Sequence, residues 1–294
     1  MKVAFAGLGV MGFPMAGHLA KAGHEMAVYN RSADKAQRWV AANGGRAGET
    51  AAEAAAGAEL FILCVGNDAD VRQVVSEALP AMAPGGVVVD HTTTSAVVAR
   101  DMAALAADGG RAFVDAPVSG GQAGAENGQL TIMCGGTPEA FSKAEPVIAA
   151  YAKATKLMGA SGSGQLAKMV NQICIAGVVQ GLAEGLHFAK RAGLDPQLVY
   201  DAISKGAAQS WQMDNRWKTM TEGKFDFGFA VDWMRKDLGL VLDEAGRNGA
   251  ALDMTAMVDG FYAEVQALGG RRWDTSSLVA RLEKPPKTPG EAEA

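Results

Sequence analysis

Short apolar runs alternate with Ala-rich amphipathic stretches through the first half of the chain. Apolar runs of this length, rich in β-branched residues, are typical of strands buried in a sheet. The predicted strands are Lys2–Ala6, Glu25–Tyr29, Leu60–Val65, Gly86–His91, Ala112–Val118, Leu130–Cys134 and Thr155–Met158. The helices predicted between the early strands are Phe13–Ala22, Ala33–Ala42, Asp70–Leu79 and Ser95–Ala107. Strand and helix in alternation indicate an α/β fold, with a doubly wound parallel sheet covered by helices on both faces.

The strand pattern stops near residue 162, and helical patterns follow. The predicted helices are Gln165–Gly193, Pro196–Ser204, Asp232–Asn248 and Thr255–Leu268. Asp195 and Pro196 form a good helix start, because Asp caps free N–H groups and Pro suits the first turn. We therefore predict an α/β domain over residues 1–162 and an all-α domain over residues 163–283, for substrate binding and oligomerisation. Residues 284–294 are Pro-rich and charged, which predicts a loose C-terminal tail.

Composition narrows the class of protein. The chain has 294 residues, 49% of them hydrophobic and 20% charged, with a net charge of −5. Scattered Lys and Arg without a basic excess argue against a nucleic-acid partner. Cys64, Cys134 and Cys174 are far apart and show no metal-ligand spacing, so we predict reduced thiols, a cytoplasmic location and no metal. A membrane span needs roughly 20 consecutive apolar residues, and no stretch of the sequence reaches that length.

A glycine-rich segment follows the first strand and opens the first helix. It comprises Gly7, Leu8, Gly9, Val10, Met11 and Gly12. In a Rossmann-type domain the first glycine allows a tight turn, the second admits a pyrophosphate and the third lets helix and strand pack closely. The helix N-terminus then favours the anion. This context predicts dinucleotide binding, whereas the glycine pattern alone would be weak.

The second strand ends in Asn30, Arg31 and Ser32. An NAD-preferring site normally carries Asp or Glu here to hold the ribose hydroxyls. Asn30 removes the carboxylate that would repel a 2′-phosphate, and Arg31 offers a fork that suits one. We therefore expect NADP rather than NAD, although NAD stays possible and an exposed polar turn is the structural alternative.

Lys168 stands in GQLAKMVNQIC, ahead of a run that carries no charge from Met169 to Ala183. A helix apolar on nearly every face is buried, and a buried ammonium needs a partner or a task. Asn171 and Gln172 share its helix face by spacing, with Gln165 one turn earlier. The alternatives are a catalytic lysine and a surface lysine whose stem alone is buried.

A second polar segment follows the strand predicted at Ala112–Val118. Its Ser119, Gly120 and Gly121 expose backbone N–H groups that, with the serine hydroxyl, could hold a small carboxylate. Taken alone, such a segment is equally an ordinary loop.

Four segments together resemble the β-hydroxyacid dehydrogenase family. They are GLGVMGFPMAGHLAKAGH, DAPVSGGQAGAENGQLTIMCGG, GSGQLAKMVNQ and WMRKDLGL, and the resemblance covers almost the whole chain. The family includes 3-hydroxyisobutyrate dehydrogenase, tartronate semialdehyde reductase and glyoxylate/succinic semialdehyde reductases. The middle segment looks most like the 3-hydroxyisobutyrate dehydrogenase branch.

The resemblance implies roles for matching residues. Lys168 matches the catalytic lysine, and Asn171 takes the assisting role, with Gln172 as second choice because many members carry the asparagine at that position. Ser119, Gly120 and Gly121 match the loop that binds the substrate carboxylate. The stretches implied to touch the dinucleotide contain Val65, Gly66, Asn67, Thr92, Thr93 and Lys236.

These parts predict an oxidoreductase that moves a hydride between NADP(H) and a small hydroxyacid such as 3-hydroxyisobutyrate. Lys168, with its pKa lowered by desolvation, would donate or accept the hydroxyl proton. Tartronate and succinic semialdehyde stay open as substrates, and a non-catalytic NADP-binding sensor is the alternative of another class. The long apolar helix Gln165–Gly193 has more apolar surface than one small domain covers, which predicts a homodimer or homotetramer.

Overall fold

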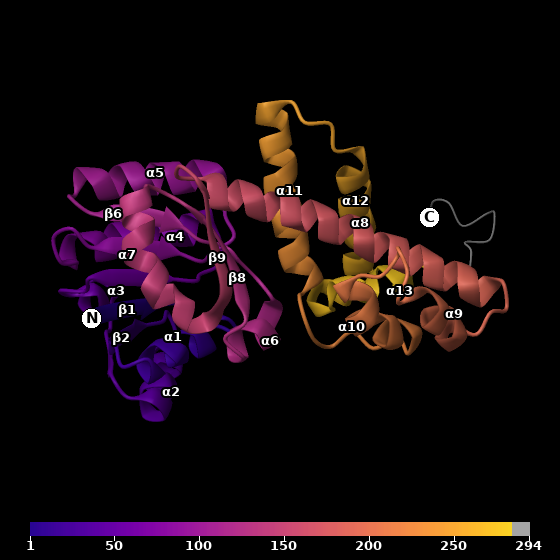
Figure 1. Cartoon of the computed structure of the whole chain (residues 1–294), viewed down its shortest axis with the longest axis horizontal. Coiled ribbons are helices and arrows are strands. Elements are labelled where there is room, and N and C mark those ends of the chain that lie inside the picture. Colours follow the sequence, from indigo (N-terminus) through magenta and orange to yellow (C-terminus); the bar gives the residue numbers. More distant parts are fainter. Residues whose placement is uncertain (284–294) are drawn as a thin grey trace, which may run out of the picture. The chain divides into compact units, whose positions relative to one another are not determined.

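The computed structural model describes residues 1–283, so the tail expected at residues 284–294 lies outside the described residues. The chain divides into two compact units, which meet between Lys168 and Met169. The boundary falls inside one long helix, α8 (Ser163–Arg191), whose first turn belongs to the first unit. Figure 1 labels the helices of both units and several of the strands.

The first unit is built on a nine-stranded sheet with the order β3-β2-β1-β4-β5-β6-β8-β7, and β9 pairs with β8. The strands are β1 (Lys2–Ala6), β2 (Glu25–Tyr29), β3 (Arg46–Ala47), β4 (Leu60–Leu63), β5 (Val87–Asp90), β6 (Ala112–Asp115), β7 (Val118–Ser119), β8 (Leu130–Gly135) and β9 (Ala152–Gly159). The prediction of an α/β, doubly wound sheet followed by an all-α part is confirmed.

The expectation of a wholly parallel sheet is wrong at β8, which runs antiparallel to β6 and β7. Only the short helix α6 (Gly121–Glu126) separates β7 from β8, and a parallel crossover needs a longer connection. The strand predicted at Ala112–Val118 is also interrupted. Pro117 lacks the N–H that a central ladder requires, and its carbonyl instead accepts from Met133 N at 3.1 Å.

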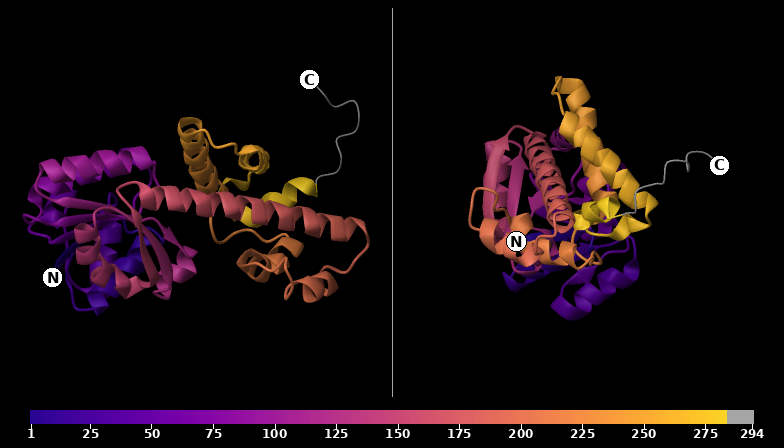
Figure 2. Two further views of the ribbon diagram at one scale, coloured as in Figure 1. Left: turned by 45° about the horizontal axis from the view of Figure 1, so that its top comes forward. Right: turned by 90° about the vertical axis from the view of Figure 1, so that its right-hand side faces the viewer.

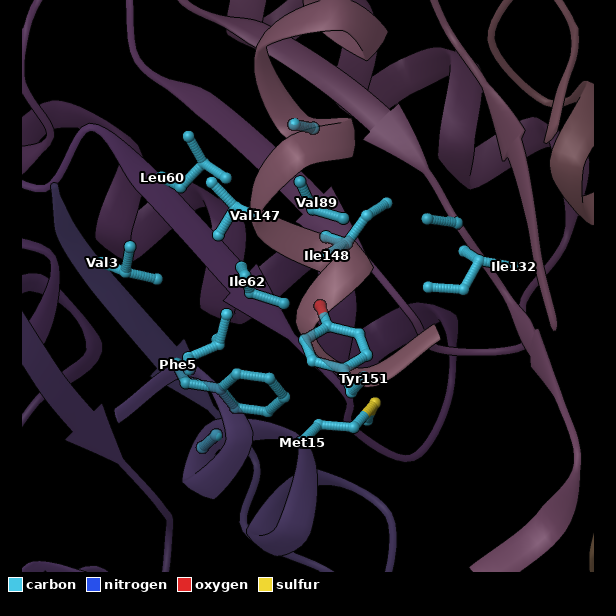
Figure 3. Packing of buried hydrophobic residues seen from close by; sticks show 14 of the residues in the cluster. Val3, Phe5, Met15, Leu60, Ile62, Val89, Ile132, Val147, Ile148 and Tyr151 are labelled. Atoms are coloured by element: carbon cyan, nitrogen blue, oxygen red, sulfur yellow. The ribbon is translucent and has the colours of Figure 1, made fainter. Parts of the chain in front are cut away.

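Helices cover both faces of this sheet (Figure 2). They are α1 (Gly12–Lys21), α2 (Ala33–Asn43), α3 (Ala51–Ala55), α4 (Asp68–Ala78), α5 (Ala96–Asp108) and α7 (Pro138–Ile148). Strand residues alternate between two cores because successive side chains point to opposite faces. Val3 and Phe5 join the core under α1, α2 and α7, while Ala4 and Ala6 join the core under α3, α4 and α5. Figure 3 shows Phe5 and Ile62 beside Met15 of α1 and Ile148 of α7.

The second unit is helical in its described part. After α8 come α9 (Pro196–Ile203), α10 (Trp211–Thr221), α11 (Val231–Asn248), α12 (Asp253–Ala267) and α13 (Leu278–Leu282). Short 3₁₀ turns occur at Leu79–Ala81, Ala149–Tyr151, Gly270–Arg272 and Thr275–Ser277. Helix α10 was not predicted, although Ser210 caps it and Met213, Trp217 and Met220 bury one face at helical spacing.

Within the described residues, α8 is the one helix whose length and composition would let it cross a membrane. It is 29 residues long, as was the helix expected at Gln165–Gly193. This is weak evidence for a membrane, because a core helix of a globular domain meets the same criterion. Ala176, Val179, Ala183 and Leu186 of α8 are packed in the core of the second unit.

Candidate active site

Glycine is needed at the three positions of the first loop for different reasons. A Cβ on Gly7 (φ +92°) would lie 2.2 Å from the carbonyl oxygen of Cys64, and a Cβ on Gly12 would lie 1.8 Å from that of Gly7. A Cβ on Gly9 would meet nothing within 4 Å. The fold therefore requires glycine at Gly7 and Gly12, whereas Gly9 keeps space open above the loop, as approach of a pyrophosphate requires.

Helix α1 presents its N-terminus to this open space. Its N-cap, Met11, makes no side-chain cap, and the first turn holds no acidic residue. Backbone N–H groups at such a terminus, together with the helix dipole, favour an anion. The loop and α1 thus fit the pyrophosphate of a dinucleotide.

Asn30 is bound to the glycine loop. Its Oδ1 accepts from Leu8 N at 2.9 Å, and its Nδ2 donates to the carbonyl of Ser32 at 3.1 Å. Asn30 therefore holds the loop in shape, a role that the sequence reading missed. The next residue, Arg31, has a side chain 91% exposed, 3.8 Å from the Asp70 carboxylate.

A hollow of about 330 Å³ adjoins the same loop. Its lining consists of Leu8, Gly9, Val10, Phe13, Lys35 and Arg38. Lys35 and Arg38 lie on one face of α2 by their i, i+3 spacing and add two cations to the hollow beside the glycine loop. The cofactor-binding residues predicted after the second strand end at Ser32, although the spacing of Lys35 and Arg38 directly after Arg31 was a usable signal.

The carboxyl ends of β4 and β5 are joined beside this loop. Val65 N donates to Thr92 Oγ1 at 3.0 Å, and Gly66 N donates to Asp70 Oδ2 at 3.2 Å. The Asn67 side chain caps α4 by accepting from Asp70 N at 3.0 Å. Thr93, which follows Thr92, is half-buried. In open α/β sheets, ligands bind at this carboxyl edge.

Asp115, at the end of β6, caps the start of α8. Its Oδ1 accepts from Gly162 N at 2.7 Å and its Oδ2 from Gln165 N at 3.0 Å. Burial raises the pKa of Asp115 to about 6, and the backbone hydrogen bonds oppose this shift. This long-range cap, which the sequence reading missed, fixes the helical turn that precedes Lys168.

Gln165 connects that first turn of α8 to the chain after β5. Its Oε1 accepts from Thr94 N at 3.0 Å, and its Nε2 donates to the carbonyl of Thr92 at 2.7 Å. Lys168 lies three residues further along α8 and is 8% exposed. It is therefore a buried lysine, and the surface alternative raised by the sequence does not hold.

Neutral His91 supports the segment before the Ser-Gly-Gly loop. Its Nδ1 lies 2.6 Å from the carbonyl of Ala116 and its Nε2 lies 2.7 Å from Tyr151 Oη. The carbonyl only accepts, so Nδ1 carries the proton and Nε2 accepts from the tyrosine. Burial lowers the pKa of His91 to about 4, which keeps this tautomer neutral at pH 7.

The Ser-Gly-Gly loop follows Ala116 and Pro117. Ser119 pairs with Thr131 of β8. Gly120 (φ +132°) and Gly121 (φ +61°) have backbone conformations that side chains rarely adopt. The tight turn after Ser119 therefore needs both glycines.

Three further predicted residues, Asn171, Gln172 and Lys236, belong to a separate network of hydrogen bonds and an ion pair in the second unit. Asn171 Nδ2 donates to Gln172 Oε1 at 2.8 Å, and Gln172 Nε2 donates to Asp237 Oδ2 at 2.6 Å. Lys236 Nζ lies 3.1 Å from Asp237 Oδ1. Gln172 and Asp237 are each 2% exposed. Gln172 thus belongs to the frame that holds Asn171, and Asp237, which the sequence reading did not single out, joins this frame to Lys236.

No group of three or more His, Cys, Asp or Glu within residues 1–283 has the arrangement of a metal site. Polar groups suited to a dinucleotide instead gather at the carboxyl edge of the sheet.

Comparison with known proteins agrees with this arrangement. The model of the NAD binding domain of 6-phosphogluconate dehydrogenase matches residues 2–161. The model described as NAD-binding of NADP-dependent 3-hydroxyisobutyrate dehydrogenase matches residues 162–282. The chain belongs to the β-hydroxyacid dehydrogenase family.

Individual relatives cover nearly the whole chain. An uncharacterized oxidoreductase of Shewanella frigidimarina is 63% identical over 96% of this chain and 98% of its own length. The probable 3-hydroxyisobutyrate dehydrogenase-like 1 of Arabidopsis thaliana is 39% identical over 96% of this chain and 85% of its own. The Mycobacterium tuberculosis 3-hydroxyisobutyrate dehydrogenase structure with L-serine has a TM-score of 0.89 at 32% identity, over 96% of this chain and 99% of its own.

Membership of the β-hydroxyacid dehydrogenase family makes this chain an NAD(P)-dependent oxidoreductase that acts on a CH–OH group. The predicted class of enzyme and its dinucleotide cofactor are confirmed at this level.

The two glycine environments predict different results for two alanine variants. Gly12→Ala should lose about 1–3 kcal/mol of folding free energy, because its methyl group collides with the Gly7 carbonyl. Gly9→Ala should fold normally but bind NADPH and NADH at least about 10-fold more weakly, because its methyl group enters the pyrophosphate space. Thermal unfolding and fluorescence titration measure the two effects. Normal dinucleotide affinity in Gly9→Ala would contradict the placement of the pyrophosphate.

Proposed function

We propose that this enzyme transfers a hydride between NADP(H) and a small β-hydroxyacid such as 3-hydroxyisobutyrate, with Lys168 as proton donor and acceptor. The observation that carries the proposal is the burial of Lys168, 8% exposed, directly after a helical turn tied to the ends of β5 and β6. A buried ammonium is costly unless it has a partner or a task, and proton transfer is the task that we assign to Lys168.

The proposed chemistry uses few groups. The bound nicotinamide supplies or accepts the hydride. In reduction, the Lys168 ammonium stabilises negative charge developing on the substrate oxygen and donates the proton to it. In oxidation, the neutral amine accepts the hydroxyl proton.

The remaining residues orient the reacting groups. Asn171, held by Gln172, orients Lys168 and the substrate hydroxyl, which assigns Gln172 a supporting role. Ser119, Gly120 and Gly121 bind the carboxylate, which turns the carbinol toward the nicotinamide. Val65, Gly66, Asn67, Thr92, Thr93 and Lys236 keep the dinucleotide-contacting role that the family resemblance implies.

The charges around the glycine loop support NADP as the preferred cofactor. The second strand is followed by Asn30, whose amide is hydrogen-bonded to the loop, and no carboxylate stands at that position. Arg31 lies next to it, and Lys35 and Arg38 line the adjoining hollow. An amide in place of a carboxylate after the second strand, followed by Arg31 and with two further cations at the hollow, suits a 2′-phosphate.

Lys168→Ala tests the mechanism. We expect kcat with 3-hydroxyisobutyrate to fall about 10²–10⁴-fold, because the proton transfer loses its positioned group, while NADPH affinity stays nearly unchanged. Lys190→Ala, on the same helix but paired with Glu283, is the matched control and should keep normal turnover. Near-normal turnover in Lys168→Ala would show that the mechanism is wrong.

The same assay, run with serine, 4-hydroxybutyrate and glycerate as alternative donors, tests the substrate. A clear preference for glycerate would favour tartronate semialdehyde as the oxidised partner, and a preference for 4-hydroxybutyrate would favour succinic semialdehyde. NADPH binding without turnover of any donor would favour the alternative that the protein is a non-catalytic NADP-binding sensor.

Arg31→Ala tests the cofactor preference. We expect affinity for NADPH to fall about 10-fold and affinity for NADH to change less than about 2-fold, because a charge-assisted hydrogen bond to the 2′-phosphate is lost. Lys21→Ala removes an exposed cation at the far end of α1 and serves as control. Equal losses for the two dinucleotides would argue against recognition of the 2′-phosphate by Arg31.

We further propose a homodimer or homotetramer formed through α8. Its exposed face carries Val170, Val178 and Phe188, which are 60%, 39% and 71% exposed. Light scattering should give a multiple of the 30.3 kDa chain mass, and Phe188→Asp should lower it. Leu105→Asp, on α5 of the first unit, is the control. A monomer at micromolar concentration would refute the proposal.

A further inference from the structure

Gln165 is a fully buried amide whose two ends are both committed to one short stretch of backbone. Its side chain has 0% exposure. Its Oε1 accepts from Thr94 N at 3.0 Å and its Nε2 donates to the carbonyl of Thr92 at 2.7 Å. An amide has one acceptor end and one donor end, so it matches this pair of backbone groups and a carboxylate or an aliphatic side chain does not.

The backbone that Gln165 binds is also tied to the neighbouring strand. Thr92 N donates to Asp90 Oδ1 at 2.9 Å, while Thr92 Oγ1 accepts from Val65 N at 3.0 Å. Residues 92–94 therefore connect the ends of β4 and β5 with α8. We define these three residues as the threonine loop.

The start of α8, which carries the amide, is fixed independently of the Gln165 side chain. Asp115 accepts from Gly162 N and from Gln165 N, which sets the start of α8 against β6. A Cβ on Gly164 would lie 2.4 Å from the Met133 carbonyl oxygen, so this turn also packs closely on β8. Lys168 follows Gln165 by three residues on this anchored helix, which places both side chains on the same side of it.

We infer that Gln165 is a positioning residue that sets the distance between the threonine loop and Lys168. This inference rests on the proposed function, in which the threonine loop contacts the dinucleotide and Lys168 moves the proton. Hydride and proton transfer both demand close alignment, and a displacement of about 1 Å costs about 100-fold in rate. Without the amide, Asp115 would still hold the helix, but the threonine loop would lose its direct hydrogen bonds to the helix that carries Lys168.

The first arm of the test needs no turnover. Hydrogen exchange is followed at residues 92–94 and at the first turn of α8, with and without NADPH, in wild type, Gln165→Met and Gln180→Met. Gln180→Met is the matched control, since Gln180 is a buried glutamine on the same helix that donates to Glu184. We expect NADPH to slow exchange in both segments of the wild type and of the control, but only in the threonine loop of Gln165→Met. Equal protection of the α8 turn in all three proteins would overturn the inference.

The second arm measures kcat and the primary deuterium isotope effect with 3-hydroxyisobutyrate. For Gln165→Met we expect kcat to fall about 10–100-fold and the isotope effect to rise, because misaligned hydride transfer becomes rate-limiting, with the KM nearly unchanged. Gln165→Glu keeps the acceptor for Thr94 N and loses the donor to Thr92, so it replaces Gln165→Met if that variant does not fold. A variant that loses thermal stability but keeps the kcat and isotope effect of Gln180→Met would show a purely structural role and overturn the inference.

The two arms separate this inference from the proposed function. Full activity of Lys168→Ala, or silence of the wild type with every donor, would contradict the proposed function, and the NADPH exchange arm would still decide whether Gln165 couples the loop to α8. Loss of activity in Lys168→Ala together with unchanged kinetics in Gln165→Met would contradict only the inference.

Discussion

The capping of α8 by the Asp115 carboxylate is the interaction on which the catalytic end of the first unit depends. A helix begins with backbone N–H groups that have no partner within it, and Asp115 accepts from those of Gly162 and Gln165. Gly135 and Gly164 make room for it, since a Cβ on either would come within 3 Å of the carboxylate. Because α8 begins at a fixed place, Lys168 has a fixed place too.

Other polar side chains, buried or half-buried, extend this frame along the carboxyl edge of the sheet. Asn30 holds the glycine loop, Thr92 joins β5 to the residues after β4, and His91 holds Ala116 ahead of the Ser-Gly-Gly loop. Each of them bonds to backbone, so the loops keep their shapes through side chains that are not themselves the proposed reacting groups. A site held in this way needs little rearrangement when it binds its ligands.

Burial also governs the protonation of this frame. Desolvation raises the pKa of Asp90 to about 7 and that of Asp115 to about 6, while it lowers the pKa of His91 to about 4. Every shift favours the neutral form, because a charge without full solvation is costly. His91 can therefore donate through Nδ1 and accept through Nε2 at neutral pH, which links β5, Ala116 and Tyr151.

Local pattern was enough to determine much of this protein. The bounds of β1 and β2, the glycine fingerprint and the apolar helix after Lys168 all follow from residues close together in the chain, where periodicity and spacing act directly. Only the tertiary structure decided the antiparallel place of β8, the cap that Asp115 provides, the Gln165 clamp and the pairing of Gln172 with Asp237. These depend on hydrogen bonds between residues far apart in the sequence, and the partner of a buried polar group is set by which chain segments the fold brings together.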